Sequence, residues 1–240
     1  MTREEELVQN YKEITEKVNQ ECQKVGRSAR SVSIMCVSKT YPLSDIQTLQ
    51  THGIRCFGEN RAQETIEKFP ERPDDLELHF IGHIQRNKVK KILPRCSWLD
   101  SIDSQRLLNE VLKQQANTDS VQPVNLLFEV NTSGETQKSG IESIEGLYDI
   151  LDLIDRTPDY QRLVNPRGLM TIGPLTDDES RIRRCFRHLR TIFEEIKGQN
   201  RYPHFDTLSM GMSSDFPIAI QEGSTMIRIG THIFGKRNYA

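Results

Sequence analysis

Short apolar runs alternate with longer amphipathic segments along the chain. Several runs are rich in β-branched and aromatic residues and end on Gly, Asn or Ser, which is typical of buried strands. The predicted strands cover residues 31–39, 54–60, 76–82, 98–103, 124–131, 167–173, 207–211 and 226–230. Eight such runs separated by helical segments predict parallel strands joined by helical crossovers.

The segments between the runs carry apolar residues at the spacing of amphipathic helices. In SQRLLNEVLKQQAN, for example, four apolar side chains from Leu107 to Leu112 share one face, and residues 141–157 and 178–199 show the same period. The segment LSDIQTLQTHG begins with a Ser–Asp pair and stops at a glycine, which are helix cap signals. A further helix, roughly Arg3 to Val25, precedes the first strand.

The strand count and the length of 240 residues predict an α/β fold, a single (β/α)8 TIM barrel with an extra N-terminal helix. An open doubly wound sheet is the structural alternative. Neither a low-complexity linker nor a break in composition divides the chain, so we expect one domain over residues 1–240.

Composition narrows the classes of partner. The net charge is −2, and 32 basic and 34 acidic residues are interspersed, so no strong field favours nucleic acid or an anionic membrane. No run reaches the ~18 apolar residues that a membrane span requires, and the charged N-terminus lacks the apolar core of a signal peptide. The five cysteines are widely spaced without a CxxC pair, which indicates reduced thiols. We therefore expect a cytoplasmic protein that binds neither nucleic acid nor membrane.

In TIM barrels the active site lies at the C-terminal ends of the strands. The first strand ends on Lys39, the second on Asn60, and the third is followed by His83, while the sixth contains Met170. Taken alone, a lysine at a strand end is most often a solvated charge, and His83 could be a satisfied structural histidine.

The loops after the seventh and eighth strands commonly form a phosphate site in barrels. GMSSDF offers the hydroxyls of Ser213 and Ser214 before a helical stretch, and RIGTHIFG offers Gly230 and the hydroxyl of Thr231. Ser-Ser-Asp is also an ordinary N-cap sequence, and Gly230 could be a simple turn glycine.

A phosphate site and a lysine on the same barrel face together suggest a phosphorylated aldehyde as ligand. A lysine amine forms a Schiff base with an aldehyde, as in pyridoxal phosphate (PLP) proteins. The amine must be unprotonated to attack, and partial burial of Lys39 would lower its pKa from the reference value of ~10.4.

Seven segments, in order along nearly the whole chain, carry a resemblance to a known family. They read VSKTYP, FGENRAQE, HFIGHIQRNK, SIDS, VNTSGETQKSGI, RGLMTIGP and LSMGMSSDFPIAIQEGSTMIRIGTHIFG. The chain resembles the pyridoxal phosphate homeostasis proteins, whose fold-type III barrel is like the N-terminal domain of alanine racemase.

The resemblance implies a role for each candidate residue. Lys39 would hold PLP as a Schiff base, Arg228 would face the pyridine nitrogen, and Asn60 would lie beside the ring. His83 and Met170 would be further pocket residues. The phosphate contacts would be Ser213, Ser214, Gly230 and Thr231.

The resemblance also implies a non-enzymatic PLP carrier, buffer or regulator in vitamin B6 homeostasis, with PLP and apo PLP-dependent enzymes as partners. No extra assembly element is evident in the sequence, so we expect a monomer. The alternative is a fold-type III amino-acid racemase or decarboxylase. Racemases of that type take their second base, a tyrosine, from an additional β domain, for which the segment after RIGTHIFG is too short. A third reading is an interaction protein in which the ligand acts as a sensor.

Overall fold

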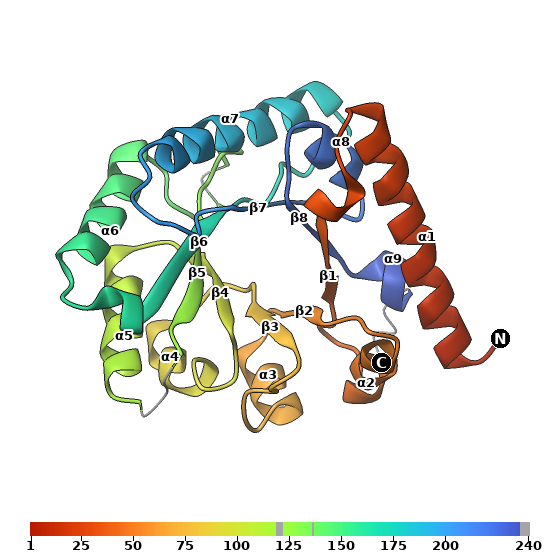
Figure 1. Ribbon diagram of the computed structural model, residues 1–240, viewed down its shortest axis with the longest axis horizontal. Helices are drawn as coiled ribbons and strands as arrows, with labels where there is room; N and C mark the ends of the chain where they lie inside the picture. Colours follow the sequence, from red (N-terminus) through yellow and green to blue (C-terminus); the bar gives the residue numbers. More distant parts are fainter. Residues whose placement is uncertain (119–121, 136, 236–240) are drawn as a thin grey trace.

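Eight parallel strands close into a barrel in which each strand pairs with its neighbour in sequence and β8 pairs with β1 (Figure 1). The computed structural model describes residues 1–118, 122–135 and 137–235, so the rest of the predicted 1–240 domain lies outside the described residues. The strands are β1 Ser33–Val37, β2 Cys56–Glu59, β3 Glu77–Phe80, β4 Trp98–Ile102, β5 Val124–Glu129, β6 Val164–Met170, β7 Thr207–Met212 and β8 Met226–Ile229. The predicted TIM barrel is confirmed, and the open sheet is wrong.

Helices surround the barrel; α1 to α8 follow one another around it in chain order, and the last helix, α9, lies beside α1 (Figure 1). They are α1 Arg3–Lys24, α2 Leu43–Thr51, α3 Ala62–Lys68, α4 Arg86–Ile92, α5 Gln105–Ala116, α6 Ile144–Arg156, α7 Glu179–Gly198, α8 Phe216–Gln221 and α9 Thr231–Phe234, with 3-10 turns at Ala29–Ser31 and Tyr160–Arg162. The predicted extra N-terminal helix is α1, which packs against α2, α8 and α9.

The start of α1 shows how local sequence sets an element. Thr2 accepts a hydrogen bond from the N–H of Glu5, and the Glu5 carboxylate accepts one from the N–H of Thr2. This capping box satisfies two of the free N–H groups at the helix start. The buried side chains of α1 include Leu7, Ile14 and Val18, at the spacing of one helical face.

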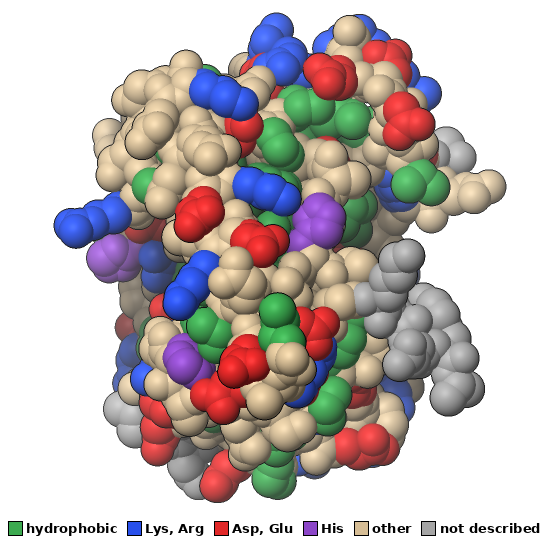
Figure 2. Space-filling model, turned by 90° about the vertical axis from the view of Figure 1, so that its right-hand side faces the viewer, with side chains coloured by type: hydrophobic (Ala, Val, Ile, Leu, Met, Phe, Trp, Pro, Cys, Tyr) green, Lys and Arg blue, Asp and Glu red, His purple; other side chains and the backbone are tan. Residues whose placement is uncertain are grey.

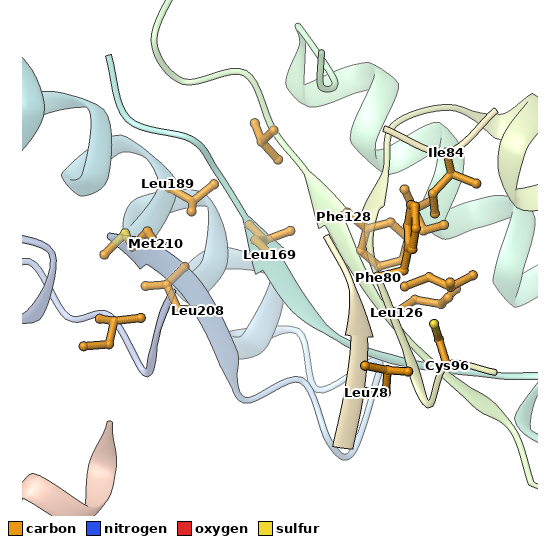
Figure 3. Packing of buried hydrophobic residues seen from close by; sticks show 14 of the residues in the cluster. Leu78, Phe80, Ile84, Cys96, Leu126, Phe128, Leu169, Leu189, Leu208 and Met210 are labelled. Carbon is orange, nitrogen blue, oxygen red and sulfur yellow. The ribbon is translucent and has the colours of Figure 1, made fainter. Parts of the chain in front are cut away.

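The barrel wall divides the core into an outer and an inner layer. Outward-facing residues such as Leu78, Phe80 and Phe128 pack under the helices (Figure 3). The inner layer includes Met35 of one small cluster and Trp98 of another. Side chains of a strand alternate between its two faces, so each strand contributes to both layers.

Strand β6 begins at Val164, three residues before the predicted start at Arg167. A proline usually excludes a segment from a central strand, and Pro166 lies within this one. The β5–β6 register shifts at that point, which accommodates the proline. Gly168 follows with φ +151°, and a Cβ there would lie 1.8 Å from the carbonyl oxygen of Thr207, so this position requires glycine.

The Ser–Asp start predicted for α2 is wrong, whereas the predicted glycine stop is confirmed, because Gly53 follows the C-cap His52 with a φ of +83°. The helix begins at Leu43 after Pro42, without a side-chain cap. Asp45 instead accepts a hydrogen bond of 2.6 Å from Arg3 of α1 and is buried by that contact. The sequence pattern also missed α3, which is only seven residues long.

On the surface, basic and acidic side chains are interspersed over the face seen from the right of Figure 1 (Figure 2). Within the described residues, no helix combines the length and the hydropathy that a membrane span requires.

Candidate functional site

A cavity of about 290 Å³ opens at the C-terminal ends of the strands. It is lined by Lys39, Asn60, Ile81, Gly82, His83, Glu129, Lys138, Ser139, Met170, Ile172, Met212 and Arg228. The structure thus brings together five of the nine residues predicted from the sequence, on the barrel face where TIM barrels bind their ligands.

A second cavity, of about 550 Å³, adjoins the first and shares Lys138, Ile172 and Met212 with it. Ser214 lines this second cavity. The remaining predicted phosphate contacts, Ser213, Gly230 and Thr231, line neither cavity. They follow β7 and β8, so they lie at the same end of the barrel.

Lys39 lies in a tight turn directly after β1. The N–H of Tyr41 donates to the carbonyl of Ser38 at 3.1 Å, and Thr40 has a φ of +70°. A positive φ is uncommon for a threonine and costs of order 1 kcal/mol or more, so surrounding contacts must hold the turn.

Those contacts come from a cluster of three charged side chains, Glu59, Lys68 and Glu64. The Lys68 ammonium donates to Glu59 at 2.8 Å, to Glu64 at 2.6 Å and to the carbonyl of Ser38 at 2.9 Å. Glu59 also accepts from the Ser38 hydroxyl at 2.7 Å, and Glu64 accepts from the N–H of Thr40. The cluster therefore holds the residues on both sides of Lys39.

The Glu59 carboxyl is fully buried, and one of its oxygens, Oε2, has no hydrogen-bond partner. Burial raises the pKa of Glu59, and the Lys68 ammonium and the Ser38 hydroxyl oppose that rise by favouring the carboxylate. A buried carboxylate in this position depends on Lys68 for its charge compensation.

Asn60 lines the cavity, and its buried Oδ1 has no hydrogen-bond partner. Its backbone is crossed closely by Gly82, where a Cβ would lie 2.2 Å from the carbonyl oxygen of Asn60. Only glycine fits at this crossing, which sets the distance between the ends of β2 and β3. An unpaired buried amide oxygen favours a ligand that donates a hydrogen bond.

Arg228 projects from β8 to the base of the cavity and is buried. Its guanidinium donates to the carbonyl and hydroxyl of Ser209 at 2.9 and 2.8 Å and to the carbonyl of Thr171 at 2.8 Å. Burial lowers the pKa of Arg228, but an arginine remains charged in proteins. The structure therefore holds a fixed cation at the cavity base.

Sequence reasoning missed two ionisable residues of the cavity wall, Glu129 and Lys138. Burial, together with nearby Asp103, raises the pKa of Glu129 to about 7, against the opposing effect of Arg228. Lys138 donates to the carbonyl of Gly173 at 2.8 Å and to Glu135 at 2.8 Å. Glu129 ends β5 and lies just before the strand end predicted at residue 131, so the strand-end rule points near it.

His83 lines the mouth of the cavity with its side chain 58% exposed, and it lies 3.3 Å from Asp103. Met170 is buried at the cavity wall. The cavity thus combines lysine amines, a buried arginine, an unpaired amide oxygen and an apolar wall. Such a set fits a small, flat ligand that carries a carbonyl group for an amine and polar atoms at its rim.

Comparison with known proteins places the chain in a well-defined group. Residues 10–238 match the family model described as alanine racemase, N-terminal domain. The pyridoxal phosphate homeostasis protein of Vibrio alginolyticus is 40% identical over 98% of this chain and 99% of that protein. The protein of the same name from Aquifex aeolicus is 38% identical over 94% of this chain and 96% of that protein.

Solved structures agree. PipY of Synechococcus elongatus with PLP bound has a TM-score of 0.74 and 31% identity and covers 91% of this chain and 100% of that chain. The alanine racemase of E. faecalis has a TM-score of 0.65 at 17% identity, and the match covers 93% of this chain and 57% of that chain. This second likeness shows a shared fold.

Proposed function

The chain belongs to the pyridoxal phosphate homeostasis protein family, and from that premise we propose that it binds PLP and acts in PLP homeostasis. The observation that carries the proposal is the position of Lys39. Lys39 lines the cavity at the C-terminal ends of the strands, together with Arg228 and with Asn60, whose buried Oδ1 has no hydrogen-bond partner.

The residues of the cavity fit PLP. When bound, PLP supplies an aldehyde that a primary amine captures reversibly. Lys39 provides that amine from a turn held on both sides by the Glu59–Lys68–Glu64 cluster. The fixed guanidinium of Arg228 suits the pyridine nitrogen, and a cation there disfavours protonation of that nitrogen. Asn60, His83 and Met170 line the remaining wall.

For the phosphate we propose the loops after β7 and β8, with Ser213, Ser214, Gly230 and Thr231 as contacts. In support, Ser214 lines the adjoining cavity. Asp215 closes the first loop by accepting from the N–H of Met212 at 2.6 Å, so its carboxylate is already occupied by the protein's own backbone.

We propose further that the protein is a carrier, buffer or regulator of PLP without catalytic turnover. The names of its relatives support this role. The competing function, an amino-acid racemase or decarboxylase, is favoured by one observation. Glu129, with a pKa raised to about 7 by burial, shares the cavity with Lys39 and could serve as a second acid or base.

Three finer points belong to the same proposal. The chain is a single PLP-binding domain over residues 1–240, it works as a monomer in the cytoplasm, and it passes PLP to apo PLP-dependent enzymes. The match to relatives over 98% of this chain and 99% of the relative supports the single domain.

The first experiment is the visible absorption spectrum of the purified protein, before and after borohydride treatment, with Lys39→Ala and Lys113→Ala compared. Lys113 is exposed on α5 and serves as the control lysine. We expect a band in the wild type and Lys113→Ala that borohydride abolishes, leaving a phosphopyridoxyl group on the Lys39 peptide. A wild type that stays colourless after incubation with PLP would overturn the proposal.

The second experiment separates carrier from enzyme. The protein is incubated in heavy water with a panel of amino acids, and deuterium at the α-carbon is measured. The carrier function predicts exchange no faster than with free PLP. Exchange that is lost on Glu129→Gln would instead establish the enzyme.

A further inference from the structure

A second group of chemically active side chains lies at the opposite, N-terminal end of the barrel. Cys56 and Glu77 are the first residues of β2 and β3 and are paired in the strand register, and His79 lies two residues further on the same face of β3. Their potential ligand atoms all lie within 4.8 Å of one another. None of the three lines the cavity of Lys39.

The His79 ring is fixed in place and fully buried. Its Nδ1 pairs with both oxygens of Asp100, at 2.9 and 3.0 Å, and the ring stacks on Trp98 with 4.6 Å between ring centroids. The other nitrogen, Nε2, is buried and has no hydrogen-bond partner. An unpaired buried nitrogen is costly, and such an atom in a native structure calls for a partner such as a water or a metal ion.

A histidine that binds a metal usually donates its other ring N–H to a carboxylate, which sets the tautomer and leaves a lone pair for the metal. The Asp100–His79 pair has this arrangement, and it leaves Nε2 as the ring nitrogen available to a cation. Two separate observations therefore support a metal site. One is the histidine oriented by Asp100, and the other is the thiol of Cys56 and the carboxylate of Glu77 close to it.

We propose that Cys56, Glu77 and His79 bind a divalent zinc-class cation, with water as the fourth ligand. Sulfur, imidazole and carboxylate donors together select zinc, rather than magnesium or calcium, which prefer oxygen alone. On coordination the Cys56 thiol releases its proton to solvent. The proposal does not depend on PLP binding.

The geometry needs only a small adjustment to form this site. Tetrahedral zinc bonds of about 2.0 to 2.3 Å separate the ligand atoms by about 3.3–3.6 Å, and the present separations are all within 4.8 Å. Glu77 is exposed, so its side chain can rotate towards the fixed His79, while Cys56 is partly buried beside Met35. A groove of about 410 Å³ reaches both residues from α1 and gives the ion a path from solvent.

A cation held here would stabilise the barrel, because it joins two neighbouring strands and binds only the folded chain. The site lies at the end of the barrel that contributes to stability rather than to chemistry. We therefore expect zinc to raise the melting temperature of the protein by the same amount in the wild type and in Lys39→Ala.

The test is titration of the chelator-treated full-length protein with zinc chloride by calorimetry, and with cobalt(II) to record the visible bands of a tetrahedral thiolate site. The variants are Cys56→Ser and Glu77→Gln. The controls are Cys185→Ser and Lys39→Ala. The Cys185 sulfur lies 2.9 Å from the Thr132 hydroxyl, a contact that a serine hydroxyl can replace. We expect one zinc per chain in wild type and both controls, and at least tenfold weaker binding in both variants.

Either of two results overturns the proposal. The first is a wild type without saturable binding at micromolar zinc. The second is binding that Cys56→Ser and Glu77→Gln leave unchanged, which would place the ion elsewhere. Both variants change the first residue of a strand. A melting temperature equal to that of the wild type in the absence of zinc will show that they are folded.

Discussion

Lys68→Met tests whether the turn of Lys39 depends on the Glu59–Lys68–Glu64 cluster. Methionine keeps most of the volume of lysine and removes three charge-assisted hydrogen bonds, to Glu59, Glu64 and the carbonyl of Ser38. It leaves Glu59, whose side chain is fully buried, without a cation. Breaking a buried ion pair from one side costs about 3–5 kcal/mol. Lys68 is 11% exposed and the Ser38 hydroxyl still donates to Glu59, and both reduce the cost. We therefore expect Lys68→Met to lower the free energy of unfolding by about 3 kcal/mol at pH 8, the low end of this range.

The cost should fall as the pH is lowered. Burial already raises the pKa of Glu59 in the wild type, and loss of the Lys68 ammonium raises it further. A carboxyl with a raised pKa in the folded state stabilises the fold at low pH and loses that contribution as the pH rises through the folded pKa. Glu59 thus has a higher pKa in the folded variant than in the folded wild type. Between these two pKa values, the cost of Lys68→Met falls by about 1.4 kcal/mol for each pH unit of acidification.

The assay is urea unfolding at pH 8 and pH 5.5, with PLP affinity measured in parallel. Lys90→Met, on the exposed face of α4, is the matched control and should stay within about 0.5 kcal/mol of wild type. The double variant Glu59→Gln/Lys68→Met removes both charges and should recover most of the lost stability. A cost below about 1 kcal/mol at pH 8, equal at both pH values, would refute the reasoning.

Three further outcomes are expected. The pKa of Glu129 is raised to about 7, so its carboxyl loses its proton between pH 5 and pH 8 and the fold loses stability there. Glu129→Gln should remove this part of the loss; an equal change in the free energy of unfolding with pH in wild type and variant would contradict this. Gly82→Ala should lower the melting temperature and weaken PLP binding, since its Cβ would lie 2.2 Å from the backbone oxygen of Asn60; an unchanged melting temperature would mean that β3 shifts freely. Arg228→Met should destabilise the protein by about 2–4 kcal/mol in denaturant unfolding, because it removes the buried guanidinium's hydrogen bonds to the Ser209 hydroxyl and the Thr171 carbonyl; a loss below about 1 kcal/mol would show that Arg228 is held for the ligand alone.

Much of the architecture is predictable because its signals are local. The alternation of apolar runs with amphipathic segments identified all eight strands, and the first turns of α1, α5 and α6 are capped by the residues directly before them, Thr2, Ser104 and Ser143. Errors arose where a distant contact overrides a local signal. Asp45 pairs with Arg3 instead of capping α2, and the shift in β5–β6 pairing admits Pro166 into a strand.

The candidate site divides in the same way. Lys39 is visible in the sequence because it ends an apolar run at the same barrel face as the two candidate phosphate loops, and the strand-end rule leads to Asn60, His83 and Met170. The rule does not find Lys138, which follows β5 in a loop and reaches the cavity through its contact with the carbonyl of Gly173.

The sequence by itself determined the order of strands and helices, the face of each that is buried, and the lysine at the centre of the proposed function. Only the tertiary structure decided which side chains from different strands meet. The cluster beside Lys39 and the group of Cys56, Glu77 and His79 depend on strand register and on the closing of the barrel. A shift of register by one residue would point each strand's side chains to the opposite face, and closure sets that register through all eight strands together.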